Sequence, residues 1–204
     1  MATDDPGILR VAKSFGAKAC LTSAEHISGT DRVAEAAEIL QLDDQRIIVN
    51  LQGDEPRMPG ALIDQVAESL STNPIASLAT ACRPLEHQEE FENRDVVKVV
   101  RDEQNLALYF SRAPIPSSRS TPPLERGGIH WSIIRRHIGL YAYRVGYLKI
   151  FLGQDPAPLE RAEKLEQLRA VWNGDPILVC DAVKMPGPGV DTLADLEEAI
   201  RYFS

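Results

Sequence analysis

Short apolar runs alternate with longer stretches of helical periodicity along most of the chain. In the run at 46–52, Ile47, Ile48, Val49 and Leu51 are apolar and only Asn50 interrupts them. An apolar run without polar alternation is typical of a strand buried on both faces of a parallel sheet. The pattern therefore predicts a central strand that ends just before Gly53.

The other apolar runs and periodic stretches predict the remaining elements. Further strands are expected at 17–21, 76–82, 137–144 and 176–183, and a hairpin pairs 96–101 with 106–111 around the turn DEQN. Helices are expected at 6–16, 33–40, 60–70, 147–152, 159–172 and 192–203. In the last helix, Leu193, Leu196 and Ile200 should face inward. Strands that alternate with helices predict a three-layer α/β fold around a mostly parallel, doubly wound sheet.

Length and turn residues set the domain organisation. A chain of 204 residues is long enough for one domain with a sizeable core, so we expect 1–204 to form a single domain. Residues 113–128 include four prolines and two glycines. This composition predicts a long loop that acts as a lid.

Composition narrows the class of protein. The formal net charge of −8 argues against nucleic-acid binding through a basic face, but it leaves room for a small anionic substrate in a local basic pocket. Three widely spaced cysteines without a CxxC pair indicate reduced thiols rather than a disulfide framework or a zinc site. The sequence has no run of membrane-span length and no signal-peptide pattern. We therefore expect a cytoplasmic protein with no membrane contact.

Two aspartates follow predicted strands. Asp54 comes directly after Gly53 at the carboxyl end of the 46–52 strand, where α/β sheets bind ligands. Asp191 follows the glycine-rich stretch PGPGV and precedes the last helix. Asp54 could instead be a turn residue, and Asp191 could cap the helix in competition with Thr192. Together the two carboxylates could share one or two Mg²⁺ ions, as in phosphoryl-transfer sites.

Polar residues in the second half of the chain are candidates for substrate contacts. Arg112 ends a strand and offers a fork that matches a carboxylate or phosphate, although a surface ion pair is equally compatible. His137, Gly139 and Tyr141 follow the period of 2, so they share one strand face with a gap that could hold a ligand between imidazole and phenol. Alternatively, His137 is a core residue whose ring nitrogens form hydrogen bonds within the protein.

Glu166 and Gln167 fall on the predicted helix 159–172, where a solvated face is the ordinary explanation for polar residues. No spacing in the chain suggests a serine–histidine–acid or cysteine–histidine arrangement, and no GxGxxG is present. The sequence therefore offers no candidate for covalent nucleophilic catalysis.

Five strings carry a resemblance to a known family. LQGDEP, FSRAPIP, RHIGLYAYR, LEQLR and PGPGVDT, in this order, resemble 3-deoxy-manno-octulosonate cytidylyltransferases, also called CMP-Kdo synthetases, and HISGTDRVAE and VVKVV also fit. The resemblance implies a nucleotidyltransferase-type, Rossmann-like fold. It also implies Mg²⁺-dependent transfer from CTP to the sugar acid Kdo, giving CMP-Kdo and pyrophosphate for lipopolysaccharide synthesis, usually by a homodimer.

The resemblance also implies roles for individual residues. The matching metal ligands are Asp54 and Asp191. Residues that match the lining of the nucleotide pocket are Ser28, Thr30, Arg32 and Gln52. Those that match contacts to the carboxylate and hydroxyls of Kdo are Arg112, His137, Tyr141, Glu166 and Gln167.

The sequence departs from the family at its start. The family begins with a strand and a basic loop of the type PARYxSTRLPGKPL, which cradles the triphosphate, whereas this chain opens at MATDDPG. Losing several charge-assisted contacts, on the order of 1.5–3 kcal/mol each, is expected to abolish useful CTP binding. A missing strand is also expected to expose a sheet edge. We hypothesise that the sequence is a shortened version of an active enzyme, which results from a misplaced start codon or a truncated gene.

Two alternatives remain open. The first is a cytidylyltransferase for another sugar acid. The strings HxGxY and LEQLR argue against this alternative. The second is a non-catalytic, sugar-acid-binding or dimer-forming remnant. Kdo binding without pyrophosphate release would favour the remnant.

Overall fold

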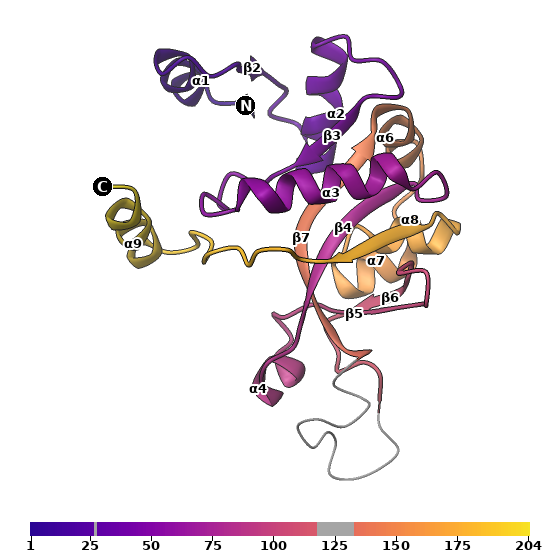
Figure 1. Ribbon diagram of the computed structural model, residues 1–204. Helices are drawn as coiled ribbons and strands as arrows, with labels where there is room; N and C mark the ends of the chain where they lie inside the picture. Colours follow the sequence, from indigo (N-terminus) through magenta and orange to yellow (C-terminus); the bar gives the residue numbers. More distant parts are fainter. Residues whose placement is uncertain (27, 118–132) are drawn as a thin grey trace.

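The computed structural model describes residues 1–26, 28–117 and 133–204, and Figure 1 shows its elements around a central sheet. The sheet of six strands consists of β3 (Ile47–Asn50), β4 (Leu78–Pro84), β5 (Lys98–Arg101), β6 (Ala107–Ser111), β7 (Arg135–Arg144) and β8 (Ile177–Asp181). Most of the predicted lid at 113–128 lies outside the described residues.

Strand β7 organises the sheet because both of its edges are used. One edge pairs with β4 from Arg135 to Tyr143. The other edge is shared: β5 pairs with Arg135 and Arg136, and β3 pairs with residues 141–144. Between them, the amide of His137 bonds to Val97 O (2.9 Å). The sheet therefore opens between the carboxyl end of β3 and the amino end of β5.

The prediction of a mostly parallel sheet is wrong in its pairing. Among the described pairs of this six-stranded sheet, only β4 and β8 are parallel, while β3–β7, β4–β7, β5–β7 and β5–β6 are antiparallel. Strands β3, β4 and β8 do run in the same direction, but β7 lies between β3 and β4. The prediction that β3 is central and buried on both faces is also wrong. It pairs only with β7 among the described residues, and Ile47 is half-buried.

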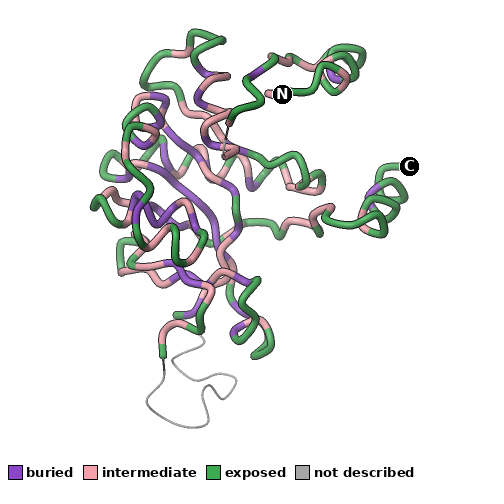
Figure 2. Tube along the Cα trace, turned by 180° about the vertical axis from the view of Figure 1, so that it is seen from behind, coloured by how far each residue is buried: buried purple, intermediate pink, exposed green. Residues whose placement is uncertain are grey.

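Helices cover both faces of the sheet, as the three-layer prediction requires. Helix α3 (Gly60–Thr72) packs Leu62, Val66 and Leu70 against one face. The other face carries α2 (Gly29–Ile39), α6 (Val145–Leu152) and α8 (Leu168–Asn173), together with the short α7 (Pro158–Glu163). The buried positions of Figure 2 follow the strands between these layers. A short helix, α4 (Gln88–Glu92), lies at the far end of β4.

The helix predicted over 159–172 is two helices. Helix α7 ends at Glu163 and α8 begins at Leu168. Lys164 adopts the left-handed conformation, with φ of 53°, which a continuing right-handed helix excludes. Leu165 is buried in the turn that follows.

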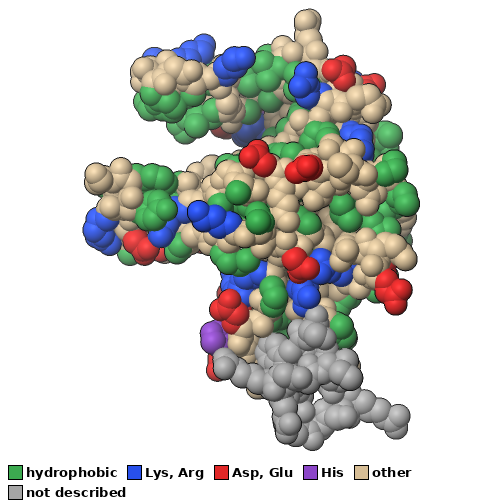
Figure 3. Space-filling view, viewed as in Figure 1, with side chains coloured by type: hydrophobic (Ala, Val, Ile, Leu, Met, Phe, Trp, Pro, Cys, Tyr) green, Lys and Arg blue, Asp and Glu red, His purple; other side chains and the backbone are tan. Residues whose placement is uncertain are grey.

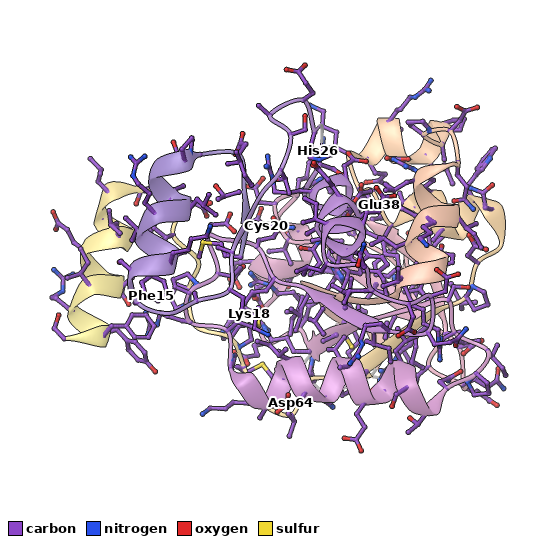
Figure 4. All side chains as sticks on the ribbon, turned by 90° about the horizontal axis from the view of Figure 1, so that it is seen from above. Phe15, Lys18, Cys20, His26, Glu38 and Asp64 are labelled. Atoms are coloured by element: carbon purple, nitrogen blue, oxygen red, sulfur yellow. The ribbon has the colours of Figure 1, made fainter. Side chains whose placement is uncertain are left out.

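Two units project from the same side of the molecule. The first contains β1 (Ala2–Thr3), α1 (Pro6–Ser14) and β2 (Cys20–Leu21), whose strands form a separate parallel pair. The second is α9 (Leu193–Phe203), and Figure 4 shows α1, with Phe15 near its end, on the side where α9 also lies. Figure 3 shows hydrophobic side chains on both units.

The prediction that Leu193, Leu196 and Ile200 face inward is wrong. Their exposed fractions are 81%, 44% and 57%. Arg57 pairs with Glu198 of helix α9 (2.7 Å) and lies over the ring of Tyr202, while Leu196 and Ile200 border a cavity of about 650 Å³ that Gly53 and Pro56 also line. In the described part of the chain, no helix is long and apolar enough to cross a membrane.

Arg144 closes the far end of α3. Its guanidinium donates to the carbonyls of Ala76 (2.9 Å), Leu70 (2.7 Å) and Asn73 (3.3 Å), the last two at the helix C-terminus. Carbonyls at a helix end lack intrahelical partners, so these bonds fix α3 to β7.

We predict that Arg144→Leu lowers the free energy of unfolding by about 1–3 kcal/mol, because carbonyls lose charged donors. Denaturant unfolding monitored by circular dichroism measures the change. Arg161→Leu, at an exposed position in the last turn of α7, is the control and should change stability little. Equal effects of the two substitutions would contradict the role given to Arg144.

Candidate active site

The candidate site lies where β3 leaves the sheet. Asn50, the last residue of β3, is buried opposite Tyr141, and the chain then continues through the exposed residues Gln52, Gly53 and Asp54. Gly53 has open space around its Cα. The carboxylate predicted after the strand is therefore accessible at the opening between β3 and β5.

Backbone hydrogen bonds bring the two predicted aspartates to neighbouring segments. Val190 N donates to Asp54 O (2.8 Å), and Gly187 N donates to Arg57 O (3.2 Å), so the residues before Asp191 run beside those after Gly53. Both aspartates are exposed. Thr192 caps α9 through its own hydroxyl, so the side chain of Asp191 is not used as the cap.

The pKa of Glu55 reflects its burial and also the nearby carboxylates of Asp54 and Asp191. Burial raises the pKa of Glu55, and the negative charges of Asp54 and Asp191 raise it further. The described residues contain no cluster of three or more metal-ligating side chains. Mg²⁺ nevertheless needs only one or two carboxylates, because it keeps several waters and binds substrate phosphates. Two accessible carboxylates on adjoining segments fit that requirement.

His137 and Tyr141 lie side by side, as predicted, but the gap expected between them is closed. Their ring centroids are 5.3 Å apart, and the edge of His137 also meets Phe110 at 5.1 Å. The register between β4 and β7 shifts at Thr80, so Ile138 and Tyr141 face consecutive residues of β4 and Gly139 falls in a bulge. The two rings therefore leave no space for a ligand between them.

The polar atoms of these two rings have unusual surroundings. Burial lowers the pKa of His137 to about 3, so the imidazole is neutral near pH 7. Burial, the neighbouring Tyr143 and the charge of Glu166 raise the pKa of Tyr141 well above its ordinary value. The buried Tyr141 hydroxyl has no hydrogen-bond partner among the described groups. Because an unpaired buried hydroxyl costs about 1–3 kcal/mol, this group is suited to a ligand.

Glu166 and Gln167 lie in the turn between α7 and α8, not on a continuous helix as predicted. Glu166 accepts a hydrogen bond from the hydroxyl of Thr30 (2.5 Å), a residue of α2. Gln167 is 7% exposed and is the N-cap residue of α8. This contact joins a residue assigned to the nucleotide pocket with one assigned to the sugar.

The other residues assigned to the nucleotide have local partners. Ser28 is the N-cap of α2 and forms a capping box with Asp31. Arg32 donates to Thr22 Oγ1 (2.7 Å) and lies 3.4 Å from Asp4. In the structure, Ser28 and Arg32 therefore make contacts within the protein that hold α2 and the N-terminal segment.

Gln52 lies over the N-terminal end of α2. A Cβ added to Gly29 would approach the Gln52 amide nitrogen to 2.8 Å, so glycine allows this close contact. Of the four residues assigned to the nucleotide, Gln52 is exposed, whereas Thr30 is buried with its hydroxyl bonded to Glu166.

Arg112 is held in place by two residues that sequence analysis missed. Its amide and Nε donate to Glu163 Oε2 (2.9 Å) and Glu163 O (3.0 Å), and a terminal nitrogen donates to Arg94 O (3.2 Å). Lys98 is fully buried and donates to Arg112 O (2.6 Å), Val96 O (2.5 Å) and Asn93 O (2.8 Å). A lysine inside the apolar string VVKVV was the signal that could have revealed this support.

A polar cavity of about 440 Å³ lies beside the bulge, between β4, β7 and residues 185–189. Glu90 joins two of its lining residues, since it pairs with Arg83 and with Arg136 (2.8 Å). Burial would raise the pKa of Glu90, but hydrogen bonds from Arg83, the Glu86 backbone and Arg136 lower it to about 2.

Comparisons with known proteins identify the family. The cytidylyltransferase family model matches residues 1–179. The 3-deoxy-manno-octulosonate cytidylyltransferase of Halorhodospira halophila is 50% identical over 202 residues, which cover 98% of this chain and 79% of the relative. The chain belongs to the 3-deoxy-manno-octulosonate cytidylyltransferase family. The enzyme of the same name from Hahella chejuensis is also 50% identical, over 97% of this chain and 78% of its own length.

Solved structures agree with this family. A CMP:2-keto-3-deoxy-manno-octonic acid synthetase complexed with CTP matches with a TM-score of 0.87 and 36% identity, over 99% of this chain and 78% of that one. A 4-diphosphocytidyl-2C-methyl-D-erythritol synthase matches with a TM-score of 0.58 and 10% identity, which shows a shared fold. The family and the nucleotidyltransferase-type fold predicted from the sequence strings are therefore confirmed.

We predict that Glu90→Gln destabilises the protein by on the order of 2 kcal/mol at pH 7, because two arginines lose their partner. The pKa of Glu90 falls from an ordinary 4.5 to about 2 on folding, so its contribution is complete above pH 4.5 and is lost as pH falls towards 2. Denaturant unfolding at pH 7 and pH 3 should show a smaller difference at pH 3. Glu92→Gln, at an exposed position of α4, is the control. A pH-independent difference would contradict the assignment.

Proposed function

We propose that the site transfers a cytidylyl group from CTP to Kdo, with Mg²⁺ bound by Asp54 and Asp191, in lipopolysaccharide synthesis. The observation that carries the proposal is the backbone pairing of Asp54 with Val190. It places the segments that carry two exposed carboxylates beside each other, and residues 187 and 189 of the second segment line the cavity that also contains His137. The family relationship supplies the two substrates.

The reaction needs no nucleophile from the protein. The anomeric oxygen of Kdo forms a bond to the α-phosphorus of CTP, the bond from that phosphorus to the pyrophosphate oxygen breaks, and the hydroxyl proton passes to solvent. The protein must hold the attacking oxygen in line and balance the charge of the leaving group. When bound, Mg²⁺ supplies positive charge at the phosphates and lowers the pKa of the attacking hydroxyl.

The remaining residues divide the work of binding. We assign the hydroxyl groups of Kdo to His137 and Tyr141, whose rings present neutral polar atoms beside each other. Glu166, fixed by Thr30, is suited to accept from a further hydroxyl. Arg112 is the cation assigned to the sugar carboxylate, and Gln52 together with Thr30 is assigned to the nucleotide side.

We also propose a homodimer, as the resemblance implies. Exposed apolar side chains on α9, such as Leu193 and Phe203, support an interface because large apolar groups gathered on one surface mark contact sites. Light scattering coupled to size-exclusion chromatography should give twice the monomer mass, and a monomer at all concentrations would contradict the assembly.

We predict that Asp54→Asn and Asp191→Asn each reduce pyrophosphate release from CTP and Kdo by at least about 100-fold, because each removes a charged metal ligand. A chelator should abolish the activity and added Mg²⁺ should restore it. Asp64→Asn is the matched control, since Asp64 lies exposed on α3 (Figure 4). Activity that survives either substitution or the chelator would overturn the metal assignment. Binding of Kdo without any pyrophosphate release would favour the non-catalytic alternative.

A further inference from the structure

The hydroxyl of Thr80 sits at the centre of the bulge in β7. Thr80 is fully buried on β4. Its Oγ1 lies 2.8 Å from Leu140 O, 3.1 Å from Ile138 O and 2.9 Å from Nε2 of His137. One oxygen therefore touches two backbone carbonyls and one imidazole nitrogen.

The protons in this group can be assigned by counting donors. A threonine hydroxyl has one proton and two lone pairs, and a carbonyl only accepts. If the hydroxyl donated to Nε2, both carbonyls would face oxygen lone pairs in a buried site. If Nε2–H donates to Oγ1, the hydroxyl proton is left for the carbonyls, of which Leu140 O at 2.8 Å is the nearer, and every proton of the group has an acceptor. Unpaired buried acceptors are costly, so the second arrangement is favoured.

This arrangement determines the state of the other ring nitrogen. The imidazole is neutral, because burial lowers the pKa of His137, so a proton on Nε2 leaves Nδ1 as an acceptor. No described residue forms a hydrogen bond with Nδ1. The Tyr141 hydroxyl, also without a partner in the described chain, lies on the neighbouring ring.

We propose that Thr80 is a positioning residue that holds His137 in its Nε2–H form, so that Nδ1 accepts a hydrogen bond from a hydroxyl group of the sugar. A sugar hydroxyl both donates and accepts, and therefore matches an acceptor on His137 beside a donor on Tyr141. A carboxylate has no proton to give Nδ1, so the acid group of the substrate binds elsewhere. The sugar part of this inference rests on the proposed function, whereas the part concerning Thr80 and His137 does not.

The first experiment reads the tautomer directly. Two-bond ¹H–¹⁵N spectra of the full chain, with ¹⁵N-labelled histidine, distinguish the two nitrogens of each ring at neutral pH. The chain has four histidines, and His137→Gln identifies the signals of His137 by their loss. We expect protonation at Nε2 alone. Protonation at Nδ1, or at both nitrogens, would overturn the proposal without the need for any variant at Thr80.

The second experiment compares Thr80→Val with Thr80→Ser. Valine removes the hydroxyl, so signals of the Nδ1–H form should appear and the affinity for Kdo, measured by calorimetry, should fall about three- to tenfold. Serine keeps the hydroxyl and should preserve both properties. Thr72→Val, at an exposed position of α3, is the control. A valine variant that keeps the parent tautomer and affinity would overturn the role of Thr80, and if it does not fold, the serine variant and the parent spectrum still decide.

The outcomes separate this inference from the proposed function. Kdo added to the parent protein should shift the Nδ1 signal of His137. If the Nε2–H form is observed but Kdo leaves that signal unchanged, the positioning by Thr80 stands and the sugar assignment of the site is wrong. If Kdo shifts a ring that is protonated at Nδ1, the binding site stands and the positioning is wrong.

Discussion

The site depends on the backbone hydrogen bonding of strand β7, whose single free edge is divided between two strands. Because β4 occupies one edge, β3 and β5 must share the other, and they meet it at opposite ends. The divided edge opens the sheet next to His137, and the bulge on the β4 edge places His137 and Tyr141 opposite Cys82 and Thr80, which are only two residues apart. The opening and the close contact of the two rings therefore both come from the pairing of β7, one from each of its edges.

The sequence predicted what local patterns control. The strand before Asp54, the helix over α3 and the hairpin of β5 and β6 follow from apolar runs, periodicity and turn residues. Strand direction does not follow from them, because an apolar run looks the same in a parallel and an antiparallel pair. The break at Lys164 depends on a backbone conformation that its residue type does not require. Helix α9 has the apolar period of a packed helix, yet Leu196 and Ile200 border an open cavity and stay exposed, so periodicity alone overestimated their burial.

The residues of the candidate site also fall into two groups, those that local sequence patterns reveal and those that they do not. The residues assigned to ligands lie in short strings with distinctive polar groups, and the same strings identified the family. Residues that act by positioning other residues could not be found in this way. Thr80, Lys98 and Glu163 are common residue types, and their importance arises from burial against specific carbonyls and amides. Burial lowers the pKa of Lys98, which the charge of Glu163 partly offsets. Only the tertiary structure reveals such contacts, although a lysine between valines already conflicts with the pattern of a buried strand.

Charged groups and neutral polar groups lie in different parts of the candidate site. Asp54 and Asp191 are exposed, so their carboxylates are solvated, whereas His137 and Tyr141 are half-buried residues that carry neutral polar groups. Placing charge among the rings would cost desolvation energy without a fixed partner, since the described neighbours of His137 are Phe110, Tyr141 and the hydroxyl of Thr80. A neutral pair gives directional hydrogen bonds that are insensitive to pH near neutrality. In the proposed reaction, recognition of the sugar hydroxyls is therefore separate from the charge interactions at the phosphates, and it does not depend on the protonation of a ring near neutral pH.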